Sequence, residues 1–243
     1  MALFMVDIET ATTRERYDEY VKRERSWRLT LKPSKNAEER ARVLMDTGPR
    51  MPHGDDPKRD KIVSIQFQKL SDLQEGEVAP LIRLREWEHP GGEGGILRDF
   101  AKATGYYSKK WDCVKVGWNL RFEDEWLRHK GVAHGLIPWG KAADFERPCI
   151  DLQHIGYLMN ADARRPAGEM GNVPNMFYGA SLSRFSRKRG AGSYITELYH
   201  ERRFAAIDDY TLQESKAFVE LWETLVREAP KWWQTVIAPR VGR

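Results

Sequence analysis

The sequence has few of the residues that identify several common protein classes. Its 243 residues include two cysteines, Cys113 and Cys149, which do not form a CxxC pair. We therefore predict no zinc site or disulfide framework, and expect both thiols to be reduced and packed. No apolar run approaches the roughly 20 residues that a bilayer-spanning helix needs. A membrane partner is therefore not expected.

Several catalytic signatures are also missing. The six histidines show neither an HExxH motif nor a paired ligand spacing. The glycine-rich run GGEGG at 91–95 lacks the Lys-Ser/Thr pair of a phosphate-binding loop, and the serines at 181–186 lack the context of a nucleophile elbow. These absences argue against zinc-protease, P-loop and serine-hydrolase chemistry.

The composition is that of an ordinary globular protein, with 41% hydrophobic and 31% charged residues, and a chain of this length can bury a substantial core. The first residues form an apolar, strand-like run without a basic leader, so we expect a cytoplasmic protein. Positive charge gathers at 13–35 and at SRFSRKRG, 183–190. Either stretch alone is explained by a solvated helix face, whereas both together favour a polyanionic partner.

Hydrophobic periodicity predicts an α/β protein. Apolar or β-branched runs predict strands at 2–8, 61–70, 78–87 and 113–119. GGEGG at 91–95 predicts a break, and the following helix is expected to end at Gly105. Further helices are predicted from Phe122 to Gly131, over 149–159 and 181–190 in whole or part, and over 208–229 with Asp208 or Asp209 as N-cap.

No repeat or linker divides the chain, so we expect a single domain over 1–243. The exception to a compact arrangement is the stretch between the first two strands, which is far longer than the short loop that joins neighbouring strands of a meander. We predict a helical or loop insertion at about 13–60.

Two carboxylates, Asp7 and Glu9, end the first predicted strand. Alternate residues of a strand point to the same face, so these two acids project together while Phe4, Val6 and Ile8 face the other way. Like charges held this close require protonation, a cationic partner or a metal, and carboxylate oxygens favour Mg²⁺ or Mn²⁺. A solvated strand end is the alternative for so short a pattern.

The last predicted helix carries another acid on an apolar face. Glu214 follows Tyr210 by four residues, and the same helical spacing continues through Ala217, Leu221 and Leu225. A buried acid needs a partner. A shared cation and a buried salt bridge to an arginine are the two alternatives.

A third acidic pair, Glu123 and Asp124, follows the strand that ends at Asn119 and lies in the first turn of the next predicted helix. Acids are favourable at a helix N-terminus because of the helix dipole, which is the simpler explanation for this pair. Its spacing relative to the other acids supports a functional role.

Three segments resemble, in order and spacing, the three motifs of the DEDD superfamily of 3′–5′ exonucleases. They are FMVDIET (4–10), VGWNLRFEDEWL (116–127) and YTLQESKAFVELW (210–222). The tyrosine of the third segment is similar to that of the tyrosine-bearing branch, which includes the exonuclease domains of B-family and A-family DNA polymerases. CIDL and ASLSRFSRKRG match elements between the motifs. The resemblance implies a ribonuclease-H-like mixed sheet flanked by helices.

The resemblance also implies a site and a reaction. The metal ligands for two Mg²⁺ or Mn²⁺ ions would be Asp7, Glu9, Glu123 or Asp124, and Glu214, and Tyr210 would orient the attacking water. Glu123 and Glu214 stand where the family usually has aspartate. The implied activity is hydrolysis at the 3′ end of single-stranded DNA or RNA; the alternative is an impaired nuclease fold that binds nucleic acid or a partner without cleaving it.

The resemblance and the aromatic content of the second motif indicate four substrate-binding residues: Thr10, Trp118, Asn119 and Phe122. Asn119 is expected to position the terminal nucleotide or the turn of the second motif. Trp118 and Phe122 are candidates for stacking on a base, as aromatic side chains do in single-strand binding. Core packing is an equally good explanation for both aromatics.

Overall fold

A five-stranded mixed sheet forms the centre of the protein, in the strand order β3-β2-β1-β4-β5. The computed structural model describes residues 2–30, 52, 54–70, 79–108, 112–142, 145, 147–152 and 194–232. The strands are β1 (Ala2–Ala11), β2 (Lys61–Lys69), β3 (Ile82–Arg85), β4 (Cys113–Gly117) and β5 (Cys149–Asp151). β1 runs antiparallel to β2 and parallel to β4, with β3 and β5 outermost. The predicted α/β class is confirmed, and the mixed sheet is compatible with a ribonuclease-H-like fold.

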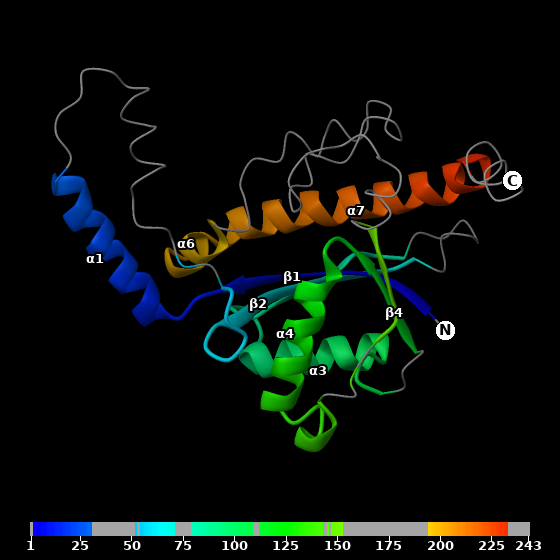
Figure 1. Ribbon diagram of the computed structural model, residues 1–243, viewed down its shortest axis with the longest axis horizontal. Coiled ribbons are helices and arrows are strands. Elements are labelled where there is room, and N and C mark those ends of the chain that lie inside the picture. Colours follow the sequence, from blue (N-terminus) through cyan, green and yellow to red (C-terminus); the bar gives the residue numbers. More distant parts are fainter. Residues whose placement is uncertain are drawn as a thin grey trace, which may run out of the picture.

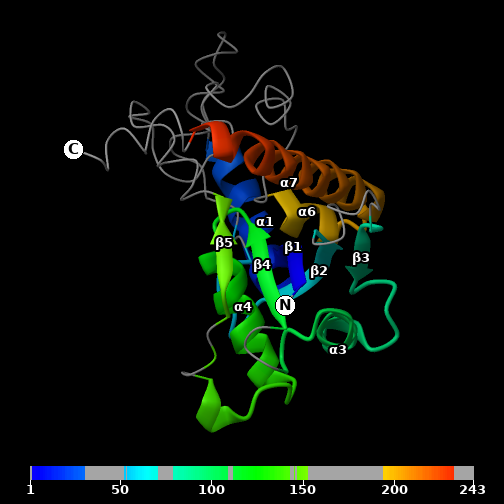
Figure 2. The same cartoon turned by 90° about the vertical axis from the view of Figure 1, so that its right-hand side faces the viewer.

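Helices cover both faces of this sheet (Figure 1, Figure 2). One face is covered by α6 (Ile195–His200) and α7 (Phe204–Trp232), and the other by α3 (Gly92–Thr104) and α4 (Leu120–Ala133). The short 3-10 helix η2 (Trp139–Lys141) follows α4, and α1 (Arg14–Thr30) follows β1. The sheet is therefore the middle layer of three.

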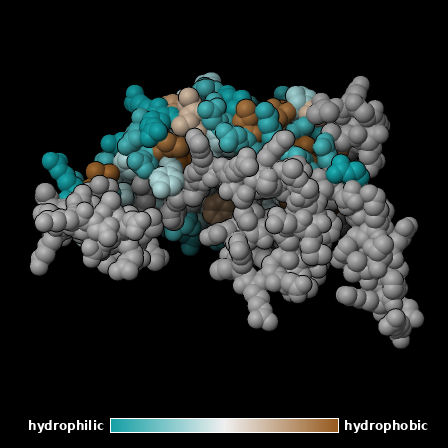
Figure 3. All heavy atoms as spheres, turned by 90° about the horizontal axis from the view of Figure 1, so that it is seen from above, coloured by the Kyte–Doolittle hydropathy of each residue, from teal (hydrophilic) through white to brown (hydrophobic). Residues whose placement is uncertain are grey.

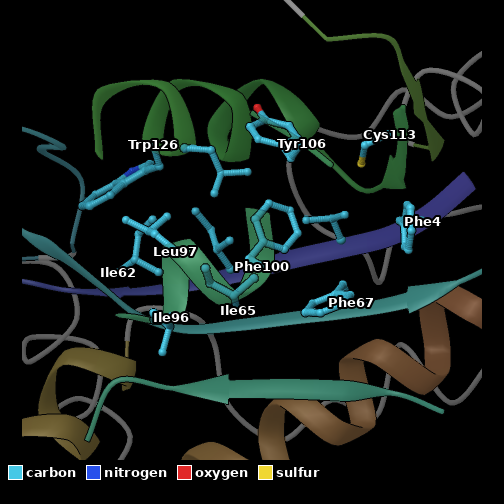
Figure 4. Packing of buried hydrophobic residues seen from close by; sticks show 13 residues of the cluster. Phe4, Ile62, Ile65, Phe67, Ile96, Leu97, Phe100, Tyr106, Cys113 and Trp126 are labelled. Atoms are coloured by element: carbon cyan, nitrogen blue, oxygen red, sulfur yellow. The ribbon is translucent and has the colours of Figure 1, made fainter. Parts of the chain in front are cut away.

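The alternation of side chains along β1 divides the core into two sides. Phe4, Val6 and Ile8 pack with residues of α3 and α4, such as Phe100 and Trp126 (Figure 4). On the opposite face, Met5 packs against Phe218 and Leu221 of α7. The side-chain pattern predicted for β1 is confirmed, and the face that carries Asp7 and Glu9 is the one under α7.

The predicted break at GGEGG is wrong, because α3 already begins at Gly92. The glycines are needed for close packing: a Cβ atom on Gly95 would lie 2.1 Å from Nδ1 of His89, and one on Gly94 would lie 2.8 Å from Nδ1 of His134. The predicted end of the helix is confirmed, since Gly105 caps it with a φ of 69°.

Other element boundaries also differ from those predicted. α4 continues past Gly131, where a Cβ atom would lie 2.6 Å from Cε1 of Tyr107, so this glycine serves packing and not termination. α7 begins at Phe204, which places Asp208 inside the helix, where its carboxylate binds Arg85 Nε at 2.6 Å. β3 covers only Ile82–Arg85 of the predicted strand 78–87.

The predicted helix over 149–159 begins as strand β5 (Cys149–Asp151), which pairs with β4. Residues 153–159 and the predicted helix at 181–190, with its basic cluster, lie outside the described residues. The expectation that both cysteines are packed holds for Cys113 and is wrong for Cys149, which is exposed at the edge of the sheet.

The predicted insertion at about 13–60 begins with α1, as expected for a helical insertion. It is attached to the sheet through Asp60, whose fully buried carboxylate accepts hydrogen bonds from Arg16 at 2.7 and 2.9 Å and from the Thr12 hydroxyl at 2.9 Å. Residues 31–51 lie outside the described part.

None of the described helices is long and apolar enough to cross a membrane. Seen from the α7 side, the coloured surface is largely hydrophilic, with hydrophobic residues in separate places (Figure 3). Large exposed hydrophobic side chains among the described residues belong to different elements or loops: Val21, Ile82, Trp139, Tyr194 and Val226.

Candidate metal centre

Three acids from β1 and α7 lie close together between the sheet and α7. Carboxylate oxygens of Asp7, Glu9 and Glu214 all lie within 4.8 Å of one another. The three residues are buried, with only 7 to 8% of their surface exposed. The predicted convergence of these acids is therefore present in the structure, although Glu214 is more than two hundred residues from Asp7 and Glu9 in sequence.

Glu214 is placed by the apolar face of α7. Ile207 packs near one end of this face and Leu221 near the other, each seven residues from Glu214 and therefore on the same side of the helix. Thr211 and Phe218 on this face are buried as well. Because both flanking positions are packed, the Glu214 side chain lies between helix and sheet.

Tyr210 belongs to the same cluster. Its hydroxyl forms a hydrogen bond with the Glu214 carboxylate, one helical turn away. Burial raises the pKa of Tyr210 far above its ordinary value, and the nearby carboxylates raise it further. The phenol therefore stays protonated at neutral pH and donates a hydrogen bond to the Glu214 carboxylate.

The structure distinguishes the two acids at the start of α4. Glu123 is 5% exposed, and its Oε2 atom is buried with no hydrogen-bond partner among the described residues. Burial raises the pKa of Glu123 well above its ordinary value, and the proximity of Asp7 raises it further. Asp124, in contrast, accepts a hydrogen bond from the Tyr106 hydroxyl at 2.9 Å and forms an ion pair with Lys115. Of the two, Glu123 is the one that interacts with the acidic cluster.

The start of α4 is held by an acid that the sequence analysis did not select as a site residue. The carboxylate of Asp151, at the end of β5, accepts hydrogen bonds from the backbone N–H groups of Asn119 at 3.1 Å and Leu120 at 3.0 Å. Asn119 makes the turn with a φ of 56°. The sequence feature that could have identified Asp151 is its position in CIDL, at the end of the strand that runs parallel to β4. Asp151 thereby fixes the turn that presents Glu123.

The predicted substrate-binding residues do not converge on one point. Thr10 is buried, and its hydroxyl donates a hydrogen bond to Gly54 O at 2.6 Å. Phe122 packs beside Trp126 on the α3 and α4 side of the sheet, with ring centroids 5.9 Å apart. Trp118 is half-buried against the Met5 cluster. Asn119 is exposed.

Strand β2 contributes polar groups that the sequence analysis missed. Gln66 lies opposite Asp7 and Ser64 lies opposite Glu9 in the antiparallel register. Both are buried, and Gln66 Nε2 donates to Ser64 Oγ at 3.2 Å. Gln66 Oε1 has no hydrogen-bond partner within the described part of the chain. The alternation of polar Ser64, Gln66 and Gln68 with apolar residues was the signal for a polar patch.

The residues present fit a divalent cation. All the converging donors are carboxylate oxygens, the ligands that Mg²⁺ and Mn²⁺ prefer. The unpaired Oε2 of Glu123 adds a buried acceptor that needs a cation or a proton. A divalent ion would offset the repulsion among these acids.

Comparisons with models of known protein families and with curated proteins found no match for this chain.

Proposed function

We propose that the protein is a metal-dependent 3′–5′ exonuclease that acts on single-stranded DNA or RNA. The observation that carries the proposal is the convergence of Asp7, Glu9 and Glu214 within 4.8 Å, beside a tyrosine that donates to Glu214. An expected cytoplasmic location and a nucleic-acid 3′ end as partner belong to the same proposal.

Asp7, Glu9, Glu214 and Glu123 would hold Mg²⁺ or Mn²⁺. Such an ion, when bound, lowers the pKa of a bound water and stabilises charge on a leaving oxygen. Tyr210 would keep the Glu214 carboxylate in one orientation, and its phenolic oxygen can accept a hydrogen bond from the reacting water. Asp124 is assigned to the pair with Lys115 and not to the metal.

Substrate contacts in this proposal come from the β4–α4 turn. Asn119 is exposed at this turn, and the half-buried Trp118 precedes it, so both can meet a terminal nucleotide. Thr10 and Phe122 are given no side-chain role, because their side chains are bonded or packed elsewhere.

The test is digestion of 5′-labelled single-stranded DNA and RNA in Mn²⁺ or Mg²⁺. The wild-type protein is expected to shorten either strand from its 3′ end, giving a ladder of labelled products. Asp7→Asn is expected to abolish cleavage because it removes a buried charged ligand. Asp209→Asn is the matched control: Asp209 is exposed and lies next to Tyr210, so its activity should equal that of the wild type.

Two outcomes contradict the proposal. Binding of the strand without cleavage in either metal supports the impaired nuclease fold instead. Cleavage that survives Asp7→Asn unchanged shows that the acidic cluster is not responsible.

A further inference from the structure

A cavity of about 430 Å³ lies beside the place where β1 passes into α1. It is lined by Arg14, Trp87, Tyr199, His200, Arg202 and Phe204. These residues come from α1, from the segment after β3, and from α6 and the start of α7, which gather at one end of the molecule (Figure 1). The cavity contains none of the carboxylates of the metal centre.

One side of the cavity consists of aromatic rings in fixed positions. Trp87 and Phe204 are stacked, with centroids 4.8 Å apart and an interplanar angle of 4°. Tyr199 lies beside both, and its hydroxyl is held by Glu86 at 2.6 Å and by Lys61 at 2.5 Å. All three rings are only partly buried. They offer a preformed apolar surface to a flat ligand.

The positive charge of the cavity belongs to its two arginines. Arg202 is exposed and has no ion-pair partner in the described part of the chain. Arg14 is also exposed and pairs with Asp18 at 2.9 Å, while donating to His200 O at 3.2 Å. The charge of Lys61, behind Tyr199, is offset by Glu86 at 3.0 Å.

His200 adds a neutral polar group. Its Nε2 donates to Thr12 O at 2.9 Å, and its ring stacks on Tyr17 at a centroid distance of 4.8 Å. Burial lowers the pKa of His200 below its ordinary value, so the ring is uncharged at neutral pH. His200 is the last residue of α6 and is partly buried.

We infer that this cavity binds a nucleotide, with the base against the aromatic rings and the phosphate at Arg14 and Arg202. A nucleotide combines the two features that the cavity offers, a planar π system and an anion that guanidinium groups bind well. Its volume lies within the roughly 300–1,000 Å³ of small-molecule sites. The ligand is either a free nucleotide or one residue of a nucleic-acid strand.

The cavity and the acidic cluster both include residues of α7. Phe204 and Tyr210 are on the same helix, about 9 Å apart along its axis. If the proposed function holds, a strand with its 3′ end at the carboxylates can place a preceding nucleotide here. This last step rests on the proposed exonuclease activity; nucleotide binding by the cavity does not.

The experiment measures binding of a fluorescein-labelled oligothymidylate in EDTA, where no metal-dependent cleavage occurs. Arg202→Asn is expected to weaken binding about tenfold, the loss typical of one charge-assisted hydrogen bond. It should also lower the slope of log K against log salt by about 0.7, the value for one lost phosphate contact on a single strand. Asparagine suits the φ of 58° at this position, so folding should be preserved.

Arg203→Gln is the matched control, because this exposed neighbour carries the same charge, pairs with Glu201 at 3.5 Å and does not line the cavity. It should bind as the wild type does. Arg14→Gln should behave like Arg202→Asn. If both cavity variants bind as tightly as the control, with an unchanged salt slope, the inference is wrong.

Competition with AMP and with ribose 5-phosphate separates the possible ligands. Displacement by AMP at concentrations where ribose 5-phosphate has no effect assigns the cavity to a free nucleotide and shows that the base contributes. Lack of displacement by either, with the dependence on Arg202 retained, assigns it to a nucleotide within a strand. Equal displacement by both refutes the role of the aromatic rings.

The two proposals fail separately. Asp7→Asn is expected to retain oligonucleotide binding in EDTA while losing cleavage. A wild-type protein that never cleaves but shows Arg202-dependent binding contradicts the exonuclease and leaves the cavity assignment standing.

Discussion

Replacing Glu214 by glutamine is expected to stabilise the metal-free protein. Its carboxylate lies within 4.8 Å of two other carboxylates, and at an effective dielectric constant of 20 each such like-charge pair costs about 3.5 kcal/mol. Hydrogen bonding to the carboxylates, such as that from Tyr210 to Glu214, reduces this figure, so we expect a net gain of about 1–3 kcal/mol in the free energy of unfolding. Glutamine keeps the volume and an oxygen that accepts from Tyr210.

The same change is expected to remove stabilisation by metal. A ligand that binds only the folded state at 100 times its Kd adds about 2.7 kcal/mol to the unfolding free energy. The wild type should gain this amount in excess Mn²⁺, while Glu214→Gln should gain little. The difference in unfolding free energy between the two proteins should therefore change by about 2.7 kcal/mol in favour of the wild type between EDTA and excess Mn²⁺.

Urea unfolding followed by tryptophan fluorescence measures both effects at neutral pH. Glu223→Gln is the control, since Glu223 is exposed on the same helix and should leave the unfolding curve unchanged in either condition. The reasoning is refuted if Glu214→Gln is less stable than the wild type in EDTA, or if Mn²⁺ stabilises both proteins equally.

Three further predictions concern the neighbours of this cluster. Tyr210→Phe keeps the ring but loses the hydrogen bond to Glu214, so cleavage of the labelled strand should slow by roughly 10- to 100-fold, as for other partners of metal ligands; an unchanged rate contradicts this. Asp151→Ala removes the carboxylate that accepts hydrogen bonds from the backbone N–H groups of Asn119 and Leu120. It should lower the unfolding free energy in urea by about 0.5–2 kcal/mol, as the loss of a capping side chain does, whereas equal stability would contradict this role. Burial raises the pKa of Glu123 in the folded protein above its unfolded value of about 4.3. In EDTA, the contribution of Glu123 to the unfolding free energy is therefore fully present below about pH 4.3. It declines by at most about 1.4 kcal/mol per pH unit as the pH rises toward the folded-state pKa. Unfolding curves of Glu123→Gln should lack this decline, and parallel pH profiles for both proteins would count against it.

The parts of the fold that were predictable from sequence depend on local periodicity. Apolar and acidic residues alternate in β1 from Val6 to Glu9, so the face on which Asp7 and Glu9 lie can be predicted from the sequence. Gly105 follows an amphipathic run and caps α3 in the left-handed conformation that glycine adopts most readily. Such signals need only a few neighbouring residues.

The parts that were not predictable depend on contacts between distant residues. From the sequence, Gly95 is expected to break a helix. In the structure it lies within α3, and the ring of His89 occupies the space that a side chain at this position would need. Glu123 and Asp124 are adjacent acids in one helical turn, and no local rule chooses between them. Lys115 and Tyr106 make the choice by binding Asp124, and these contacts exist only after β4, α4 and the end of α3 have come together.

Contacts between distant residues also decide whether the Glu214 side chain can reach the proposed metal site. Ile207 and Leu221 are packed in separate core clusters, seven residues to either side, so α7 cannot roll to expose Glu214 without opening both. Burying three acids opposes folding, and the apolar contacts of the helix offset that cost. A longer side chain then matters less than the position of the helix, because the carboxylate is confined between α7 and the sheet wherever its extra methylene group lies. A glutamate at position 214, where the exonuclease resemblance implies an aspartate, is thus compatible with the proposed metal site.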